Sequence, residues 1–408
     1  MEQTKQSTSL KKIASQFANG SKVVAVDPLG NGNINSTYLV TLSPTTSPGR
    51  FVLQRINQQV FRRPELVIQN MSVLCEHLKA SGHTLERQWE TERQWETERQ
   101  WETERRWETE RRWETPRILP TAQGQNFWRD ETGEYWRAIS FIENSQVFET
   151  IESLEHAREV GTGLAMFHRL ISTLPTEKLA DTLEGFHITP TYLARYAQVL
   201  AEREGQGISL TANLTAEQTA QVNYCLAFVA QRREWAHVLE VAKEAGHLPL
   251  RPIHGDPKVN NIMLGTDGKA VSLIDLDTLK PGLVHYDIGD CLRSGCNPLG
   301  EETHDWQAVT FDTERAKAML EGYLSLAKDF LTEQDYRYLY DAIRLIAFEL
   351  GLRFFTDYLA GNVYFKVNDP DHNLRRSLVQ FKLTESIEAQ ADALKAIIEA
   401  LKIAEEPT

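Results

Sequence analysis

The sequence predicts an α+β fold of two lobes, a small antiparallel sheet followed by a mainly helical region. Up to about residue 143, short apolar runs alternate with turn residues, which is the pattern of antiparallel strands. From residue 152 onward, apolar residues recur three and four positions apart, as on one face of a helix. The chain has 408 residues, enough for two domains of ~100–200 residues each. We therefore divide it into an N-terminal lobe, 1–143, and a C-terminal lobe, 144–408.

The composition excludes several classes of protein. Hydrophobic residues make up 41% of the chain and charged residues 25%, which is ordinary for a globular protein. The net charge of −13 argues against nucleic acid or an anionic membrane as partner. No apolar run reaches the ~18 residues of a membrane span, and residues 1–10 lack the apolar core of a signal peptide. The four cysteines form no C-x-x-C pair, which indicates neither zinc nor a disulfide framework. We expect a cytoplasmic protein.

The first lobe begins with a predicted strand–turn–strand hairpin. Apolar residues at 23–26 are followed by the stretch 29–40, LGNGNINSTYLV. Glycine lets backbone N–H groups approach a phosphate closely, and in kinases a glycine-rich loop covers the ATP phosphates. We therefore assign Gly30 and Gly32 to the ATP phosphates. A plain turn is the alternative, since Asn35 stands where a third glycine would be.

The next predicted strand, 51–56, carries a candidate phosphate ligand. In kinases a lysine at this place pairs with the α/β-phosphates. Here the residue is Arg55, which keeps the charge and can hold phosphate with two nitrogen atoms; an exposed strand arginine is the alternative. A helix opened by Pro64 follows and runs to about residue 80. By analogy with kinases, a glutamate of this helix would pair with Arg55, with Glu76 the better candidate by position and Glu65 the other.

Residues 86–115 consist of a six-residue repeat, three copies of ERQWET followed by two of ERRWET. At about 100° per residue, successive tryptophans point ~240° apart on a helix, so they form no single apolar stripe. Glutamate, arginine and glutamine favour helix, and we expect an exposed helix or a mobile insertion. A protein-binding arm is one interpretation. We favour a tandem expansion tolerated in a surface connection.

Three more strands complete a predicted sheet of about five strands, at 116–120, 126–129 and 135–142. The chain then crosses into the second lobe at 141–144. In kinases adenine lies against such a linker through backbone hydrogen bonds. We therefore place adenine at Phe141, Ile142 and Glu143.

The second lobe shows clear helix signals. An apolar series with helical spacing covers 154–171. Pairs typical of capping boxes open two further helices, Thr215 with Gln218 for a helix to about residue 245, and Thr332 with Asp335 for a helix over 333–360. A last amphipathic helix is predicted over 376–403.

The stretch 251–282, RPIHGDPKVNNIMLGTDGKAVSLIDLDTLKPG, carries the strongest functional pattern. It predicts a strand ending at His254, a loop, and then a hairpin, because Asp-Gly between two apolar runs is a strong hairpin signal. Three side chains should then lie together at the open end of a small sheet, namely Asp256, Asn261 and Asp275.

This set predicts ATP-dependent phosphoryl transfer. Asp256 would accept the proton of the attacking hydroxyl, while Asn261 and Asp275 would hold Mg²⁺ against the triphosphate. Such oxygen ligands suit Mg²⁺, which needs few protein groups. Lys258, two residues after the base, is placed to reach the transferred phosphate. The alternatives are a buried hairpin with incidental acids and a solvent-facing lysine.

The pattern of His254, Asp256 and Asn261 resembles the kinase catalytic loop H-R-D-L-x-x-x-N. Gly255 and the I-D-L-D sequence at 274–277 resemble the aminoglycoside phosphotransferase and choline kinase family more than protein kinases. Within that family, HGDPKVNN, IDLDT and GLVHYDIGDCLR resemble N-acetylhexosamine 1-kinases. The resemblance extends over nearly the whole chain outside the repeat. It implies a bilobal protein-kinase-like fold that binds ATP and Mg²⁺ between its lobes.

The resemblance also implies an acceptor. In those kinases the glycine loop reaches the sugar, which makes Asn33 and Asn35 candidates for sugar or phosphate contacts. Their sugar pocket carries R-F-x-x-D and a later Y-F, and we transfer this only to Arg353, Asp357 and Tyr364. An ordinary helix end with aromatic core residues is the alternative.

The expected activity is phosphorylation of the anomeric hydroxyl of an N-acetylhexosamine, giving a sugar 1-phosphate. Choline, homoserine or an aminoglycoside would use the same chemistry with another acceptor. A pseudokinase that binds partners through the tryptophan repeat is a third interpretation, which the intact catalytic set argues against. Asp290 with Arg293 resembles a structural G-D-x-x-R element, and we expect it to support the site. For His168 we expect packing on its helix, with no role in the chemistry.

Overall fold

The computed structural model describes residues 9–30, 34–43, 49–81, 112–207, 209–212 and 214–404. The chain forms two compact units, the first with residues 1–146, 173–183 and 263–280 and the second with residues 147–172, 184–262 and 281–408. Residues 173–183 and 263–280 thus belong with the N-terminal residues. The predicted division at a single boundary, between residues 143 and 144, did not include them. Gly32, Asn33 and the repeat up to residue 111 lie outside the described residues.

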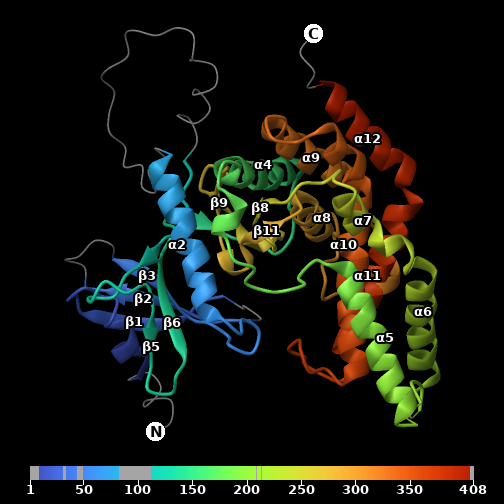
Figure 1. Cartoon of the computed structure of the whole chain (residues 1–408), viewed down its shortest axis with the longest axis horizontal. Helices are drawn as coiled ribbons and strands as arrows, with labels where there is room; N and C mark the ends of the chain where they lie inside the picture. Colours follow the sequence, from blue (N-terminus) through green and yellow to red (C-terminus); the bar gives the residue numbers. More distant parts are fainter. Residues whose placement is uncertain are drawn as a thin grey trace. The chain divides into compact units, whose positions relative to one another are not determined.

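Within the described residues, a six-stranded antiparallel sheet is the centre of the first unit. Its strands follow the order β1 (Val23–Pro28), β2 (Ser36–Leu42), β3 (Arg50–Arg55), β6 (Tyr135–Ser140) and β4 (Ile118–Leu119), and β5 (Trp128–Arg129) also pairs with β6. Helix α2 (Pro64–Ala80) lies beside the sheet (Figure 1). The predicted sheet and the helix opened by Pro64 are confirmed.

The two faces of this sheet bury different groups. Phe51, Leu53 and Ala138 pack with apolar residues of the segment 13–18 on one face. Because side chains alternate along a strand, Arg137 points to the other face. There it contacts the Sδ atom of Met71 on α2 at 3.8 Å. An arginine is therefore enclosed between the sheet and the helix.

The predicted hairpin is present as β9 (Ile262–Gly265) and β10 (Ala270–Leu273), with β7 (Ser145–Gln146) on the outer side of β9. Gly268 closes its turn with a left-handed φ of 77° and donates to the Gly265 carbonyl at 3.0 Å. The strand before the catalytic loop, β8 (Arg251–Ile253), pairs with β11 (Lys280–Gly282) in a separate two-stranded sheet. The expectation of one small sheet is therefore wrong. Gly282 allows this pairing, because a Cβ there would lie 2.3 Å from the Ile253 side chain.

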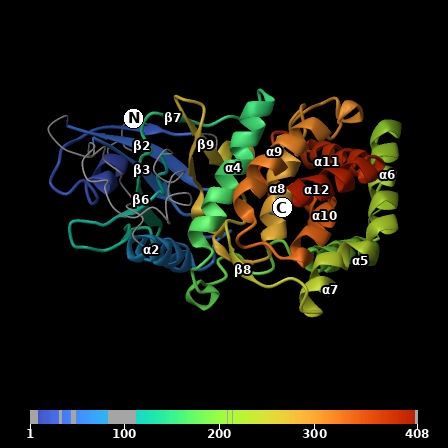
Figure 2. The ribbon, with the colours of Figure 1, turned by 90° about the horizontal axis from the view of Figure 1, so that it is seen from above.

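The second unit is mainly helical. Its helices are α4 (Leu154–Ile171), α5 (Thr189–Gly205), α6 (Ala216–Arg232), α7 (Val238–Glu244), α8 (Val284–Gly295), α9 (Thr313–Ala327), α10 (Glu333–Ala360), α11 (His372–Ala389) and α12 (Ala391–Ala404). Helix α10 contacts α5, α8, α11 and α12 (Figure 1, Figure 2). Both predicted capping boxes, at Thr215 and Thr332, are confirmed. Among the described helices, none is both long and apolar enough for a membrane span.

Two predicted helices are interrupted in the structure. The helix from Thr215 ends at Arg232, and a short turn around Trp235 separates it from α7. That turn is anchored by Trp235, whose indole N–H donates to Asp341 at 3.3 Å. The predicted last helix divides at Gln390, whose side chain donates to the Phe311 carbonyl at 2.9 Å. In both places a tertiary contact overrides the helical pattern of the sequence.

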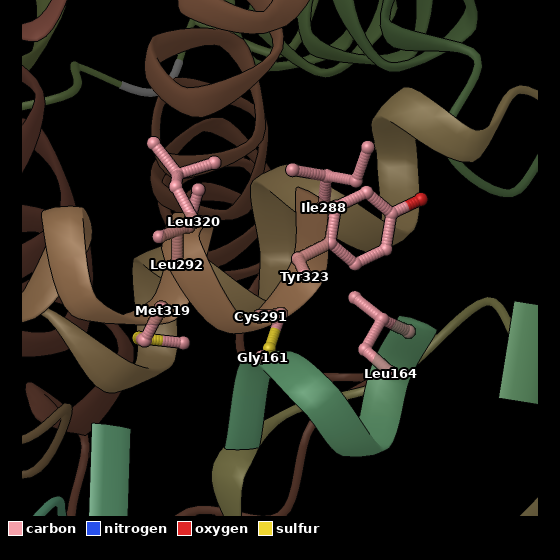
Figure 3. A pocket seen from close by; sticks show the side chains of 8 residues that line it. All are labelled: Gly161, Leu164, Ile288, Cys291, Leu292, Met319, Leu320 and Tyr323. Carbon is pink, nitrogen blue, oxygen red and sulfur yellow. The ribbon is translucent and has the colours of Figure 1, made fainter. Parts of the chain in front are cut away.

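Helices α4 and α9 approach closely through two glycines. A Cβ on Gly161 would lie 1.9 Å from the Met319 carbonyl oxygen, and a Cβ on Gly322 would lie 2.0 Å from that of Arg158. Only glycine fits at such distances. Figure 3 shows Gly161 and Met319 with apolar side chains of α4, α8 and α9 around a small cavity at this crossing. The crossing fixes two helices that carry residues behind the catalytic loop.

Candidate active site

The catalytic loop brings three predicted residues together within the second unit. Lys258 Nζ donates to Asp256 Oδ2 at 2.9 Å. Asn261 Nδ2 donates to the same carboxylate oxygen at 3.3 Å and to the backbone carbonyl of Asp256 at 2.7 Å. The loop therefore presents a carboxylate that accepts from both an ammonium and an amide, and the contact of Asp256 with Asn261 agrees with the sequence spacing.

The environment of Asp256 favours its charged form. Burial alone would raise the pKa of this carboxyl, but the ammonium of Lys258, with smaller contributions from His254 and Arg293, outweighs burial, so the pKa of Asp256 lies below its ordinary value. The group is therefore a carboxylate at neutral pH. A carboxylate can accept a hydrogen bond, and then a proton, from a bound hydroxyl.

The two predicted metal ligands offer oxygen atoms. Because the loop holds the amide nitrogen of Asn261, its carbonyl oxygen is the atom left for a cation. Asp275 belongs to the first unit and follows β10 with an exposed side chain and left-handed backbone angles, φ 66° and ψ 57°. That conformation is rare for a residue other than glycine. An amide oxygen and a carboxylate oxygen are each a ligand type that suits Mg²⁺, which accepts few protein ligands and keeps several waters.

Asp287 on α8 fixes the backbone of the catalytic loop. Its carboxylate accepts the backbone N–H groups of His254 at 2.7 Å and Gly255 at 2.8 Å. His168 Nε2 lies 2.8 Å from the same carboxylate, and its Nδ1 lies 2.8 Å from the Tyr323 hydroxyl. Burial would raise the pKa of Asp287, but the hydrogen bond and charge of His168, together with His254 and the Gly255 N–H, outweigh burial, so the pKa is lowered. His168 is thus a buried support of the loop.

A second ion pair lies on the same helix. Arg293 donates to Asp290 at 2.8 Å and to Glu301 at 3.1 Å. Both Asp290 and Arg293 are buried. The expected structural pair is therefore present, one helical turn from Asp287.

Arg353 on α10 is surrounded by aromatic rings. The centre of its guanidinium lies 5.0 Å from the Phe186 ring, 5.1 Å from the Tyr192 ring and 5.5 Å from the Phe365 ring. Among the described residues, no carboxylate or carbonyl satisfies its N–H groups. The three rings were not predicted, because they come from separate parts of the chain.

Asp357, one turn further along α10, is occupied by internal hydrogen bonds. Its carboxylate accepts the backbone N–H groups of Val363 and Tyr364 at 2.9 Å and of Phe365 at 3.0 Å, and it also accepts from Asn373 at 2.9 Å. The side chain of Tyr364 remains exposed. Asp357 therefore shapes the turn that presents Tyr364.

The predicted nucleotide residues of the first unit are exposed. Arg55 donates to the Ser36 hydroxyl at 3.2 Å, and among the described residues it has no carboxylate partner. Glu76 is exposed on α2, and Glu65 pairs instead with Arg63 at 3.3 Å. The kinase-like pairing of Arg55 with a glutamate is thus not found. Gly30 is exposed with a left-handed φ of 69°.

A buried cation of this unit is Arg137, which the sequence analysis missed. It donates to Gln54 Oε1 from Nη2 at 2.8 Å and forms an ion pair with Asp277. Asp277 also accepts from Asn35 Nδ2 at 2.5 Å, and Asn35 Oδ1 accepts the Asn57 backbone N–H at 2.9 Å. This network holds the backbone next to Asp275. An arginine amid the apolar residues of strand 135–140 was the available signal.

The predicted adenine linker is tied to its neighbours. The Arg50 guanidinium lies 4.6 Å from the centre of the Phe141 ring and pairs with the Glu143 carboxylate. The Ile142 carbonyl accepts from Ser145 Oγ at 2.8 Å, and the Glu143 carbonyl accepts from Arg112 at 2.7 Å. Arg112 belongs to the last repeat copy. That end of the repeat is therefore part of the folded unit.

An antiparallel-sheet unit, a helical unit and this catalytic loop together define a kinase-like phosphotransferase. A family profile described as the phosphotransferase enzyme family, APH, matches residues 25–319, and the chain belongs to that family. It is a small-molecule phosphotransferase with a hydroxyl acceptor.

Solved structures share the fold. An aminoglycoside phosphotransferase from Alicyclobacillus acidocaldarius is 16% identical, with 96% of each chain covered and a TM-score of 0.55. A microcompartment-associated aminopropanol kinase is 14% identical, with 94% of this chain and 98% of that chain covered and a TM-score of 0.54. A spectinomycin phosphotransferase in complex with ADP and spectinomycin is 13% identical, with 98% of each chain covered and a TM-score of 0.50.

Proposed function

We propose that this enzyme transfers the γ-phosphate of ATP to the anomeric hydroxyl of an N-acetylhexosamine. The hydroxyl oxygen bonds to the γ-phosphorus as the bond to the bridging β–γ oxygen breaks, and ADP leaves. Asp256 orients the hydroxyl and takes its proton, and Lys258 contacts the transferred phosphate. Asn261 and Asp275 would hold Mg²⁺, which neutralises charge on the phosphates.

The proposed nucleotide residues lie in the first unit. Gly30, Gly32 and Arg55 are assigned to the phosphates, and the linker at 141–143 to adenine. The exposure of Gly30 and Arg55 leaves them accessible to a ligand. Glu76, also exposed, would act on Arg55 only if the nucleotide brings the two side chains together.

The observation that favours a neutral sugar is the environment of Arg353. Its guanidinium lies against three aromatic rings and carries hydrogen-bond donors that no described residue satisfies. Sugar hydroxyls and an acetamido carbonyl can accept those hydrogen bonds. Tyr364, presented by the turn that Asp357 shapes, adds an aromatic face for C–H groups of a ring. Asn33 and Asn35 remain proposed contacts from the glycine loop.

The same environment disfavours cationic acceptors. A quaternary ammonium needs aromatic faces around it, and here an arginine already lies against those rings. Like charges placed together cost several kcal/mol. Choline and aminoglycosides would meet this repulsion, and the zwitterion homoserine would meet it at its ammonium group.

A panel of acceptors tests the proposal. We expect ATP consumption with N-acetylglucosamine or N-acetylgalactosamine to exceed that with choline, homoserine or kanamycin by at least 100-fold in kcat/KM. Phosphorus NMR of the product should show a phosphate coupled to the anomeric proton. Turnover only with choline or kanamycin would refute the acceptor assignment and leave the family standing.

The matched control is Asp256→Asn, which keeps the shape of the side chain. We expect phosphoryl transfer to fall by about 10³-fold, because a positioned base contributes roughly 10²–10⁴-fold. ATP binding, measured by calorimetry, should be retained. Unchanged turnover in this variant would exclude Asp256 as the base.

A further inference from the structure

His187 lies buried beside the catalytic loop although no motif marks it. It precedes α5 in the left-handed conformation, with φ 64°. Its Nε2 lies 2.7 Å from the Gly255 carbonyl oxygen and its Nδ1 lies 2.9 Å from Glu349 Oε1. A residue other than glycine keeps such a conformation only where its surroundings fix it, and such residues cluster at functional sites.

The partners of His187 indicate its charge. A backbone carbonyl only accepts hydrogen bonds, so Nε2 donates to Gly255. Glu349 Oε2 accepts from the Thr189 hydroxyl at 2.6 Å, a length typical of a hydroxyl donating to a carboxylate. If Glu349 is a carboxylate, Nδ1 of His187 donates as well. Both ring nitrogens then carry protons, and the ring is an imidazolium.

The remaining neighbours agree with that charge. From α8, Asp290 adds negative charge and the Tyr286 ring stacks on the imidazole with centroids 5.4 Å apart. Arg353 lies one turn beyond Glu349 on α10 and is the opposing cation. Burial alone would lower the pKa of His187, but Glu349 together with Asp290 and the Gly255 carbonyl outweighs burial, and the pKa is raised.

The bond to Gly255 matters because of the peptide it belongs to. The Gly255 carbonyl and the Asp256 N–H are the two polar groups of one peptide unit. The N–H donates to His254 Nδ1 at 3.2 Å, and the carbonyl accepts from His187. Gly255 itself has φ 91°, a conformation from which glycine rotates easily. Holding both ends of this peptide sets the direction of Asp256.

We propose that His187 is a positioning residue, an imidazolium held by Glu349 that fixes the Gly255–Asp256 peptide and thereby aims Asp256. The inference rests on the proposed role of Asp256 as the base. It also ties the helix that carries Arg353 to the catalytic loop, since Glu349 and Arg353 are neighbours on α10.

Three variants test it, namely His187→Leu, His187→Gln and Glu349→Gln, with His247→Gln as control because His247 is an exposed histidine of the same unit. In His187→Leu we expect kcat to fall 10- to 100-fold while the ATP Kd changes less than twofold. His187→Gln should recover part of kcat, because its amide can still donate to Gly255. The control should match the parent enzyme.

Nitrogen NMR of the histidine rings reports the protonation of both ring nitrogens of His187. If His187 only packed in the core, Glu349→Gln would not change this protonation. At pH 8 we expect both nitrogens of His187 to be protonated in the parent enzyme and the ring to be neutral in Glu349→Gln. A neutral ring in the parent enzyme would overturn the proposal. It would also be overturned if His187→Leu kept full kcat while Asp256→Asn lost it, and the proposed function would stand. Full kcat in Asp256→Asn would instead refute the proposed role of Asp256 as the base. If His187→Leu does not fold, the ring spectra of the parent enzyme and of Glu349→Gln test the proposal about His187.

Discussion

Two regions with predicted site residues differ in how far the chain itself arranges those residues. One is the catalytic loop of the second unit, and the other is the β2–β3 region of the first unit. In the loop, Lys258 and Asn261 both donate to the carboxylate of Asp256. In the β2–β3 region, Arg55 is exposed and its hydrogen bond goes to a serine hydroxyl. Both sets were predicted by analogy with kinases, but only the first is assembled by the chain itself.

The difference between the two regions shows where buried charged groups hold the backbone in place. Behind the catalytic loop, Asp287 and His187 hold backbone groups of residues 254 and 255. In the first unit, Arg137 pairs with Asp277, two residues after Asp275. In each unit a buried ionic group anchors the chain beside a residue assigned to the chemistry. Among the described residues, Arg55 has no such anchor, which suits a group that a ligand would organise.

The largest effect on stability is expected from breaking the buried pair of the first unit. Arg137 is 1% exposed, so Arg137→Met leaves Asp277 buried without its cation. Removing one partner of a buried ion pair costs about 3–5 kcal/mol. We expect a loss of that size in the free energy of unfolding of the first unit, measured by urea denaturation followed through tryptophan fluorescence.

The double variant Arg137→Met with Asp277→Leu sharpens this test. It removes both charges, and well-packed apolar replacements of a buried pair are often neutral. We expect it to be more stable than either single variant, which a double-mutant cycle would record as a coupling energy. Additive losses would show that the two residues stabilise the unit independently.

A second prediction concerns pH in the catalytic loop. In Lys258→Met, the half-buried Asp256 loses the ammonium that lowers its pKa, so the pKa rises. Because Asp256 must be ionised to take a proton, the rate falls as pH falls through this pKa. The acid limb of the kcat profile should therefore lie at higher pH in the variant than in the parent enzyme. Stability follows the same sign, since a carboxylate with a lowered pKa stabilises the fold above its ordinary pKa and loses this as pH falls.

At neutral pH the same variant should lose roughly 10–100-fold in kcat, because an electrostatic contact to the transferred phosphate is removed. Lys328→Met, at an exposed position on the second unit, is the matched control and should leave both the rate and the profile unchanged. An acid limb that does not move in Lys258→Met would show that Lys258 does not set the charge of Asp256.

The sequence predicted what short-range patterns encode. The hairpin over 262–273, the capping boxes at Thr215 and Thr332 and the contacts between Asp256 and Asn261 all depend on residues a few positions apart. The supports of the site depend on pairs far apart in the chain, 33 residues for His254 with Asp287 and 140 for Arg137 with Asp277. No local propensity specifies such pairs, because they exist only once the helices and strands have packed.

Tertiary contacts also changed the role expected of single residues. Asp357 was assigned to the sugar from a matching motif, yet its carboxylate accepts four internal N–H groups. The turn at 361–365 that supplies three of them follows the helix and carried no local signal. The motif thus pointed to this region of the chain, but the role of Asp357 within it is set by the backbone N–H groups of the turn that it holds.

The smallest effect on stability is expected at two exposed residues of the first unit, Arg55 at the end of β3 and Glu76 on α2. Changes at these two residues test the comparison most directly. Arg55→Met repeats the chemical change of Arg137→Met at an exposed site, so the free energy of unfolding should change by no more than about 0.5 kcal/mol. If Arg55 binds phosphate, the KM for ATP should still rise about tenfold, equivalent to about 1.4 kcal/mol. Glu76→Gln should change neither quantity, because the structure shows no pairing of Glu76 with Arg55 among the described residues. A rise in the KM for ATP in Glu76→Gln as large as in Arg55→Met would mean that the nucleotide itself brings the two side chains together. The difference between the catalytic loop and the β2–β3 region would then hold only for the enzyme without bound nucleotide.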